Sequence, residues 1–472
     1  MKRTLRDVFQ LTFPGLVLMA LTACDGGSGS SPMTTHTPMS TVTPMGTYMV
    51  GGTVTGLTGS GLVLQNNAGD DLAVSAAGAF TFTAGVANGA AYAVTVKTQP
   101  SSPAQNCVVY GSPGTVADEN VTNVLVSCTA VGRFAYAANA GDNTISVYSI
   151  NSTTGALTPV GSPVPTGSSP YAIAARPDGQ YLYVVNEISN NISVYAVNAT
   201  SGGLTAIPSS PFAAGMDPQA LSFDPSGAYL YVANNGSDNL SAYAVNGSTG
   251  ALTPLSTATY ATGAGPSAVS VSSDGRFVFV ANHGGSNDIS VFAITAGTGA
   301  LSPVAGSPFA AGGNPHSAVL TPFPSPWDYG GPGGAYLYTA NFDGTSSTIS
   351  AISVDTDTGA LIPLSGSPVA VPVSNYIGTD LNGLYLYVAT GTGVLAYSLK
   401  TELPFALAGF PVESGRNAYS VTVDPSNQFL YVGNEGSANI AGYRFDAANG
   451  GLTAIPGSPF AAGSQPDFIA IL

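Results

Sequence analysis

The hexapeptide Tyr229-Leu-Tyr-Val-Ala-Asn234 decides the fold, because close copies of it recur along the chain. Each copy alternates side chains with the period of two that is expected of a β-strand. The last residues of successive copies lie 44 to 59 positions apart. The seven copies span residues 134–139, 181–186, 229–234, 277–282, 336–341, 385–390 and 429–434.

Three further strand signals accompany each copy. Upstream lies a run such as Pro218-Gln-Ala-Leu-Ser-Phe, closed by a Pro-Ser-Gly or Ser-Asp-Gly turn. Downstream lie a run such as Ile145-Ser-Val-Tyr148 and then, after a turn, Gly-Ala-Leu-Thr-Pro or Gly-Gly-Leu-Thr-Ala. Four short strands in a unit of about 48 residues, repeated seven times, are typical of a β-propeller. We name these strands A to D from the channel outward.

The two ends of the repeat region predict how the ring closes. The first unit begins at Phe134 without a strand A, and the chain ends in a strand A run, Gln465-Pro-Asp-Phe-Ile-Ala-Ile-Leu472, without a strand B. A closed ring leaves no long sheet edge exposed. We therefore predict an all-β fold: a seven-bladed β-propeller whose carboxy-terminal strand completes the first blade, preceded by a small β-sandwich domain.

Composition agrees with a turn-rich β protein and argues against a nucleic-acid partner. Charged residues make up 7% of the chain, and it has 59 Gly and 34 Pro, so long helices and coiled coils are not expected. The net charge is −15. Nucleic-acid binding needs clustered cations, and beyond the amino-terminal Lys2, Arg3 and Arg6 the sequence has no such cluster, so no nucleic-acid partner is expected.

The amino terminus predicts export. Lys2, Arg3 and Arg6 precede a short apolar stretch, residues 9–21, which is the layout of a secretory signal. The stretch ends in Leu21-Thr-Ala-Cys24, which resembles a bacterial lipobox. The resemblance implies removal of residues 1–23, lipidation of Cys24 and anchoring to a membrane of the cell envelope, on its periplasmic or outer side. The alternative is an ordinary signal peptide with a chance cysteine. Residues 24–46 then form a flexible tether.

Residues 47–130 predict a separate domain of short strands with Gly, Asn and Asp turns, at the spacing of an Ig-like β-sandwich. Cys107 and Cys128 lie in this domain. Because exported proteins meet an oxidising environment, we predict a disulfide between them. Two buried free thiols are the alternative.

The Tyr-Leu-Tyr-Val-Ala-Asn repeat resembles the YVTN family, and residues 131–472 resemble the lactonase-like seven-bladed propellers. The best-known activities of that family are 6-phosphogluconolactone hydrolysis and muconate cycloisomerisation. Glu187, after Val184-Val185-Asn186, resembles the family's Asn-Glu element, and Asn314-Pro315-His316 resembles its His-containing D–A loop. Where the family has Pro-Arg-His, this chain has Pro170-Tyr-Ala, Pro218-Gln-Ala and Pro266-Ser-Ala.

The D–A and B–C loops of a propeller share one rim, where we place the candidate site. For lactone hydrolysis, a carboxylate or a histidine would activate water, and an arginine or a histidine would stabilise the oxyanion. The predicted catalytic residues are Glu187, His316 and Arg416. The predicted ligand-binding face contains Tyr171, Asp217, Gln219, His283, Asp343, Tyr376, Glu435 and Asp467.

From the sequence we expect a monomeric, lipid-anchored propeller that binds a ligand, or a protein or carbohydrate partner of the envelope, on its channel face. The alternative is a lactonase-like hydrolase. Neither a cofactor nor a metal is expected. The longest unit contains the segment 322–334, which we expect to be an A–B loop on the opposite rim.

Overall fold

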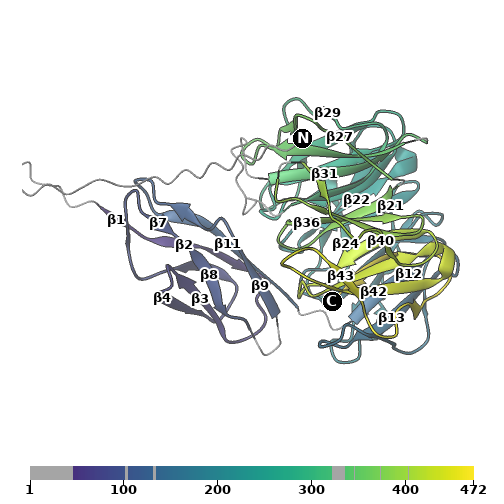
Figure 1. Cartoon of the computed structure of the whole chain (residues 1–472), viewed down its shortest axis with the longest axis horizontal. Coiled ribbons are helices and arrows are strands. Elements are labelled where there is room, and N and C mark those ends of the chain that lie inside the picture. The colour runs from purple at the N-terminus through teal and green to yellow at the C-terminus, as the bar shows by residue number, and fades with distance from the viewer. Residues whose placement is uncertain are drawn as a thin grey trace, which may run out of the picture. The chain divides into compact units, whose positions relative to one another are not determined.

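In the computed structural model, the described residues are 46–100, 105–130, 134–321, 335–344, 346–372, 374–401 and 403–472. They form a small β domain, residues 46–130, and a ring of β-sheets from residue 134 to the carboxy terminus (Figure 1). The predicted signal peptide, Cys24 and segment 322–334 lie outside the described residues, as does the predicted tether except for Gly46. Within those residues, no helix has the length and apolar character that a membrane crossing requires.

The small domain has two main sheets, with strand orders β5-β2-β11-β9 and β4-β3-β8. Its apolar core contains Leu64, Phe82 and Val126. Cys107 and Cys128 lie directly opposite each other on β9 and β11 and form a disulfide, as predicted. The Ig-like assignment stays a prediction. The strands are β1 (Thr47–Tyr48), β2 (Val50–Thr55), β3 (Leu62–Asn66), β4 (Asp70–Val74), β5 (Gly78–Thr81), β6 (Val86–Ala87), β7 (Ala91–Tyr92), β8 (Val94–Thr98), β9 (Gln105–Tyr110), β10 (Gly114–Thr115) and β11 (Val121–Ala130).

From residue 134 onward the described strands form seven antiparallel sheets, the blades that the repeat predicts. From the first blade to the seventh, the A strands are β45 (Pro466–Ile471), β16 (Pro170–Ala175), β21 (Pro218–Phe223), β25 (Pro266–Val271), β30 (Pro315–Leu320), β35 (Ser374–Thr379) and β40 (Ala418–Val423). The B strands are β12 (Phe134–Asn139), β17 (Tyr181–Asn186), β22 (Tyr229–Asn234), β26 (Phe277–Asn282), β31 (Ala335–Phe342), β36 (Tyr385–Thr390) and β41 (Phe429–Asn434).

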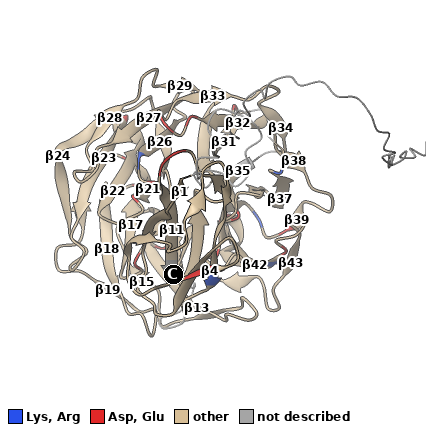
Figure 2. Cartoon of the chain, turned by 90° about the vertical axis from the view of Figure 1, so that its left-hand side faces the viewer, with Lys and Arg blue, Asp and Glu red and all other residues tan. Residues whose placement is uncertain are grey.

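The outer strands follow in the same order, and Figure 2 shows them succeeding one another around the ring. The C strands are β13 (Thr144–Ile150), β18 (Asn191–Val197), β23 (Asn239–Val245), β27 (Asp288–Ile294), β32 (Ser347–Val354), β37 (Gly393–Ser398) and β42 (Asn439–Phe445). Short 3-10 turns, η1 (Asn235–Ser237) and η2 (Glu435–Ser437), connect B to C in the third and seventh blades.

The D strand is more broken than the sequence predicts, because in six blades two short pieces pair with opposite halves of strand C. In four of these blades a serine hydroxyl accepts a backbone N–H of strand C near the break, as Ser210 does for Val194. The pieces are β14 (Leu157–Pro159) with β15 (Val164–Pro165), β19 (Leu204–Ala206) with β20 (Phe212–Ala213), β28 (Leu301–Pro303) with β29 (Phe309–Ala310), β33 (Leu361–Pro363) with β34 (Val369–Val371), β38 (Phe405–Ala406) with β39 (Val412–Glu413), and β43 (Leu452–Ala454) with β44 (Phe460–Ala461). The third blade has one continuous strand, β24 (Leu252–Ala261).

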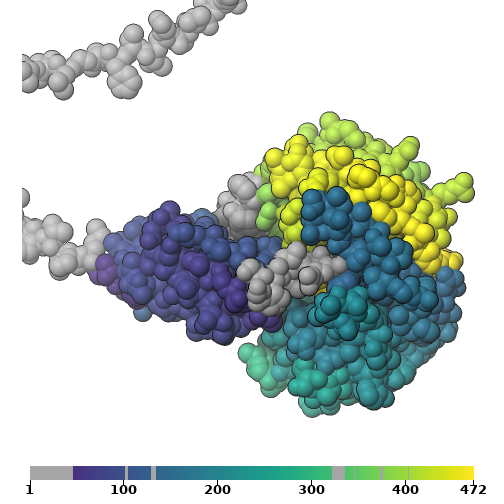
Figure 3. Space-filling view, turned by 90° about the horizontal axis from the view of Figure 1, so that it is seen from below, coloured from purple at the N-terminus to yellow at the C-terminus, as the bar shows by residue number. Residues whose placement is uncertain are grey.

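The ring closes where predicted. Strand β45 pairs antiparallel with β12, which places Ile471 opposite Ala135 and Ile469 opposite Ala137. Phe134 and Leu472 exchange two backbone hydrogen bonds of 2.9 Å each. Figure 3 shows first-blade residues (blue) lying against the carboxy-terminal residues (yellow). The first blade is therefore built from both ends of the ring.

The polar residue that ends most B strands is structural. The Asn234 side chain is fully buried and donates to Asn239 Oδ1 at 2.8 Å and to Ser241 Oγ at 2.9 Å. It thereby links strand B to strand C across the turn. Because the same contacts recur around the ring, these asparagines fix the rim on which the candidate site lies.

Candidate functional site

A β-bulge at the start of strand A leaves one side chain unpaired in five of the seven blades. In the second blade Pro170 pairs with Asn186 and Ala172 with Val185, so Tyr171 is the extra, unpaired residue. Such bulges re-aim a side chain. The same register shift leaves Gln219, Ser267, His316 and Tyr419 unpaired in other blades.

These bulge residues line a cavity of about 310 Å³ at the channel mouth. Loops and strands of the second to seventh blades contribute to it, so it depends on the closed ring. This volume is within the range of small-molecule sites. The lining residues are Tyr171, Gln219, Ser267, His283, Asn314, His316, Phe342, Tyr376 and Tyr419.

Three tyrosine hydroxyls meet on one side of the cavity. The Tyr171 hydroxyl lies 2.8 Å from that of Tyr376 and also hydrogen-bonds that of Tyr419. The Phe468 ring packs against all three, with centroid separations of 4.7 to 5.9 Å. Burial raises the pKa of each phenol, that of Tyr376 to about 12, so all three remain protonated at neutral pH. The Tyr376 and Tyr419 hydroxyls also interact with each other, and each phenol keeps one O–H that can donate either to a neighbouring hydroxyl or to a ligand.

Two histidines also line the cavity. The His316 ring stands edge-on to Tyr376, with centroids 5.8 Å apart. His283 Nε2 lies 2.8 Å from Asn235 Nδ2. Burial lowers the pKa of His283, although its hydrogen bond with Asn314 acts in the opposite direction. Because an amide nitrogen donates, His283 Nε2 accepts, and the ring is a fixed, neutral imidazole at pH 7.

Three carboxyl groups gather near the tyrosines. Glu187 accepts hydrogen bonds from Gln219 Nε2 at 3.2 Å and from Ser169 Oγ at 3.1 Å. Glu435 accepts from Gln465 Nε2 at 3.1 Å and from Asn417 Nδ2. Asp467 is 6% exposed. Burial, with the charges of Glu435 and Glu187, raises its pKa to about 8.

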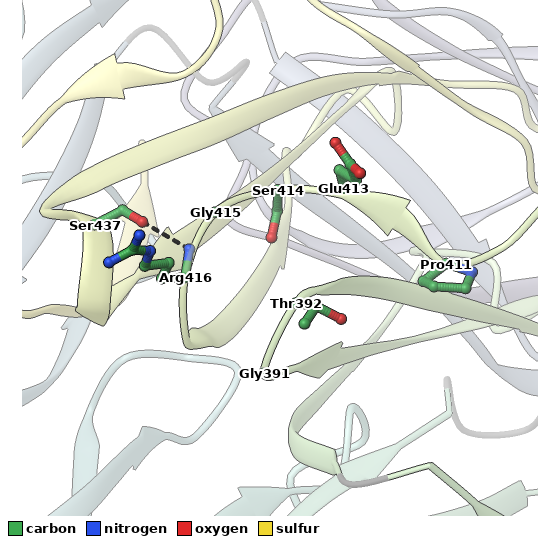
Figure 4. A pocket seen from close by; sticks show the side chains of 8 residues that line it. All are labelled: Gly391, Thr392, Pro411, Glu413, Ser414, Gly415, Arg416 and Ser437. Atoms are coloured by element: carbon green, nitrogen blue, oxygen red, sulfur yellow. Dashed lines mark hydrogen bonds between the residues drawn. The ribbon is translucent and has the colours of Figure 1, made fainter.

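Arg416 lines a different cavity, of about 520 Å³, on the same rim. Its backbone N–H donates to Ser437 Oγ, and Glu413, Ser414 and Thr392 also line this hollow (Figure 4). The sixth blade has a short B–C turn here, because β37 begins three residues after Thr390, whereas β42 of the seventh blade begins five residues after Asn434. Arg416 is not among the residues that line the tyrosine and histidine cavity.

Of the other predicted residues, some line the channel-mouth cavity and some lie outside it. Tyr171, Gln219, His283, His316 and Tyr376 line the channel-mouth cavity. Asp217 is exposed on the rim. Asp343 accepts hydrogen bonds from the backbone and hydroxyl of Ser346.

Tyr419, Ser267, Asn314 and Phe342 line the cavity but were not singled out from the sequence. The position of Tyr419 could have been found by aligning its blade with the Pro-Tyr of Pro170-Tyr171.

Charge on the described residues is sparse, as Figure 2 shows. None of the described residues that line the channel-mouth cavity is Lys or Arg. Across the described ranges, no three His, Cys, Asp or Glu side chains are close enough together to hold a metal ion. The site can therefore offer hydroxyl, amide, imidazole and carboxyl groups to a ligand.

Seven closed blades with a ligand-sized cavity at the D–A and B–C rim define a β-propeller with its candidate site at the channel mouth. The model of the family described as lactonase, 7-bladed β-propeller, matches residues 104–216, 212–265, 254–322 and 321–466. The chain belongs to this family.

Solved structures with a similar fold include a candidate 6-phosphogluconolactonase from Bacteroides uniformis (TM-score 0.61, 17% identity, covering 72% of this chain and 99% of that one). A second, from Bacteroides fragilis, has TM-score 0.59 and 18% identity, covering 72% and 97%. The periplasmic gluconolactonase PpgL of Pseudomonas aeruginosa has TM-score 0.58 and 17% identity, covering 72% and 98%. No curated protein matched the sequence.

Proposed function

We propose that the protein hydrolyses a lactone without a phosphate group in the channel-mouth cavity. One observation carries the proposal: the described lining has imidazole, phenol and amide groups but neither Lys nor Arg, and the carboxylate of Glu187 is hydrogen-bonded to the lining residue Gln219. Because a phosphoryl group is recognised by cations, an unphosphorylated lactone suits this lining better than 6-phosphogluconolactone. Membership of the lactonase family supports the reaction type. The periplasmic gluconolactonase with a similar fold supports the substrate class.

In the proposed reaction, His316 accepts a proton from the water that attacks the lactone carbonyl carbon. One hydroxyl of the tyrosine cluster, Tyr171, Tyr376 and Tyr419, donates its hydrogen to the oxyanion of the tetrahedral intermediate. As the bond from the carbonyl carbon to the ring oxygen breaks, protonated His316 returns the proton to that oxygen. The product is the open hydroxy acid, with one water consumed.

The test is a steady-state assay of the full chain with glucono-δ-lactone and with 6-phosphogluconolactone, in which acid release is followed above buffer hydrolysis. We expect the unphosphorylated lactone to have the higher kcat/KM. His316→Ala should lower kcat by about 10²- to 10⁴-fold, the usual contribution of a general base. Arg416→Ala serves as the matched control on the same rim and should leave kcat/KM for glucono-δ-lactone within about twofold, since Arg416 lines another cavity. Turnover equal to buffer for both lactones would contradict the proposal.

A second candidate function is ligand binding without turnover. The placement of Arg416 in a separate cavity favours it, because the cation expected to polarise the carbonyl group is not part of the channel-mouth lining. A lactone or sugar that binds in calorimetry, without acid release, would support this alternative.

We further propose that the protein works outside the cytoplasm as a lipid-anchored monomer. The support is in the sequence alone: the cationic start, the apolar stretch 9–21 and Leu21-Thr-Ala-Cys24. Metabolic labelling with a radioactive fatty acid should mark the wild-type chain, and Cys24→Ala should abolish the label. Export of an unlabelled wild-type chain would instead indicate an ordinary signal peptide.

A further inference from the structure

Asp467 stands out among the carboxyl groups at the channel mouth. Its side chain is 6% exposed, yet within the described part of the chain it makes neither a hydrogen bond nor an ion pair. Glu187 and Glu435, in contrast, are each held by two donors. The Asp467 oxygens are not among the fully buried atoms without a partner, so they keep some contact with solvent. A largely buried carboxyl group that has no donor and can still be reached is better suited to a charged ligand than to a structural role.

The surroundings of Asp467 are negative and aromatic. Glu435 and Glu187 are near enough for their charges to raise the pKa of Asp467. Asp467 in turn acts on the pKa of Tyr376 and Tyr419, two rings that line the cavity. Asp467 also follows Pro466 at the β-bulge of the first blade, where Pro466 pairs with Asn139 and Ile469 with Ala137. It therefore occupies the position from which Tyr171 lines the cavity in the second blade. An overall charge of −15 adds to the attraction for cations.

The chemistry of this cluster favours an organic ammonium group over a metal ion. No three carboxylate or imidazole groups among the described residues are close enough to surround a metal. The rings of Tyr171, Tyr376, Tyr419 and Phe468 lie within 4.7 to 6.1 Å of one another. Aromatic rings beside a carboxylate are a favourable environment for an ammonium cation.

We propose that Asp467, flanked by Glu187 and Glu435, forms a subsite for an ammonium group, so that the ligand of the channel-mouth cavity is an amine-bearing sugar or its lactone. The lactone part of this statement rests on the proposed function, whereas the ammonium subsite does not. Arg416 lines a separate cavity, so it does not neutralise the negative charge of the carboxylates near the tyrosines.

Calorimetric titration of the full chain with 6-amino-6-deoxyglucose and with glucose tests the subsite, because the two sugars differ only in an ammonium in place of a hydroxyl. At pH 8 we expect the amine to bind at least about tenfold more tightly than glucose. Asp467→Asn should remove this preference while leaving glucose affinity within about twofold. Glu435→Gln, which alters a more exposed carboxylate, should weaken amine binding by about threefold. Asp357→Asn, an exposed carboxylate on the opposite rim, is the charge-matched control and should change neither affinity.

Protonation gives a second readout. Asp467 must be ionised to bind the cation, so amine affinity should fall by up to about tenfold per pH unit below pH 8. The titratable groups that face Asp467 are Glu187, Glu435 and the phenols of Tyr376 and Tyr419, and the phenols stay neutral over this range.

Equal affinity for the two sugars, or an amine preference that survives Asp467→Asn, would overturn the subsite. So would calcium binding that depends on Asp467 in the absence of amine binding. An amine preference without any lactone turnover would instead leave the subsite standing and contradict the proposed hydrolysis.

Discussion

The hydroxyl of Tyr431 in the seventh blade donates a 2.7 Å hydrogen bond to the carbonyl oxygen of Gly155 in the first blade. Equivalent bonds join Tyr136 to Gly202, Tyr183 to Gly250 and Tyr231 to Gly299. The second aromatic residue of the repeated hexapeptide thus links each of these B strands to the C–D turn of the following blade. The repeat therefore encodes contacts between blades as well as strands within them.

Tyr431→Phe should reduce the free energy of unfolding by about 1–3 kcal/mol, because it leaves the buried carbonyl of Gly155 without a partner. Urea unfolding followed by tyrosine fluorescence and circular dichroism measures the change. The matched control is Tyr260→Phe, since the Tyr260 hydroxyl is buried without a hydrogen-bond partner among the described residues. That control should be neutral or slightly stabilising, and a loss as large as that of Tyr431→Phe would contradict the explanation.

Truncation after Gln465 should prevent cooperative folding of the ring, since it removes β45 with the buried residues Ile469 and Ala470. Each buried aliphatic side chain of the size of Ile contributes about 1.5–3 kcal/mol, and the backbone pairing with β12 is lost as well. A synthetic peptide of residues 464–472 should restore the thermal transition of the truncated chain. A scrambled peptide of the same composition is the control. A truncated chain as stable as wild type would show that closure by β45 is dispensable.

The sequence allowed the ring to be predicted because each blade repeats the same buried strand. Residues such as Leu182 and Val184 on strand B are fully buried. Because the equivalent positions of every blade need apolar side chains, all seven copies of the hexapeptide resemble one another. The closure by β45 also followed from the sequence, because one strand A was missing at the start and one was left over at the end. Both inferences depend on local sequence patterns, the repeated hexapeptide and the unmatched strand A segments, and the strands form where these patterns predict them.

The site was predicted less completely, for a definable physical reason. The side chain that enters the channel is the bulge residue after the first residue of strand A, and a proline marks it in Pro170-Tyr171, Pro218-Gln219 and Pro315-His316. In the seventh blade Ala418 stands where these three blades have proline, so the proline signal does not mark Tyr419. The hydrogen bonds of the tyrosine hydroxyl cluster join residues more than 200 positions apart in the sequence. A local sequence pattern cannot predict such a contact.

Removing the disulfide should destabilise the small domain selectively. Cys107 and Cys128 are 21 residues apart, and a loop of that length corresponds to about 3 kcal/mol of lost unfolded-state entropy. The double variant Cys107→Ala with Cys128→Ala should unfold in two steps, the small domain at lower urea, whereas ligand binding at the propeller cavity should be retained. Treatment of the wild-type chain with dithiothreitol should reproduce the effect, and it should not alter the double variant further.

The free energy of unfolding should depend on pH through Asp467. The pKa of Asp467 is raised in the folded protein to about 8 from an ordinary value of 3.8, so the folded state holds its proton more tightly than the unfolded state. The stabilisation is complete below about pH 4 and is lost progressively as pH rises toward 8, at up to about 1.4 kcal/mol per pH unit. Asp467→Asn removes this titration and should therefore become more stable than wild type as pH increases across this window.

The comparison of wild type with Asp467→Asn must separate the effect of Asp467 on the free energy of unfolding from the effects of other titrating groups. His283, whose pKa is lowered by burial, acts in the opposite sense, since its contribution is lost as pH falls below its ordinary value of 6.5. Because His283 is present in both chains, it cancels in the difference between wild type and Asp467→Asn, measured by urea unfolding at each pH. Asp357→Asn should run parallel to wild type at every pH. A constant difference between wild type and Asp467→Asn from pH 4 to pH 8 would mean that the Asp467 carboxyl is solvated and ionised, which would also remove the electrostatic basis of the ammonium subsite.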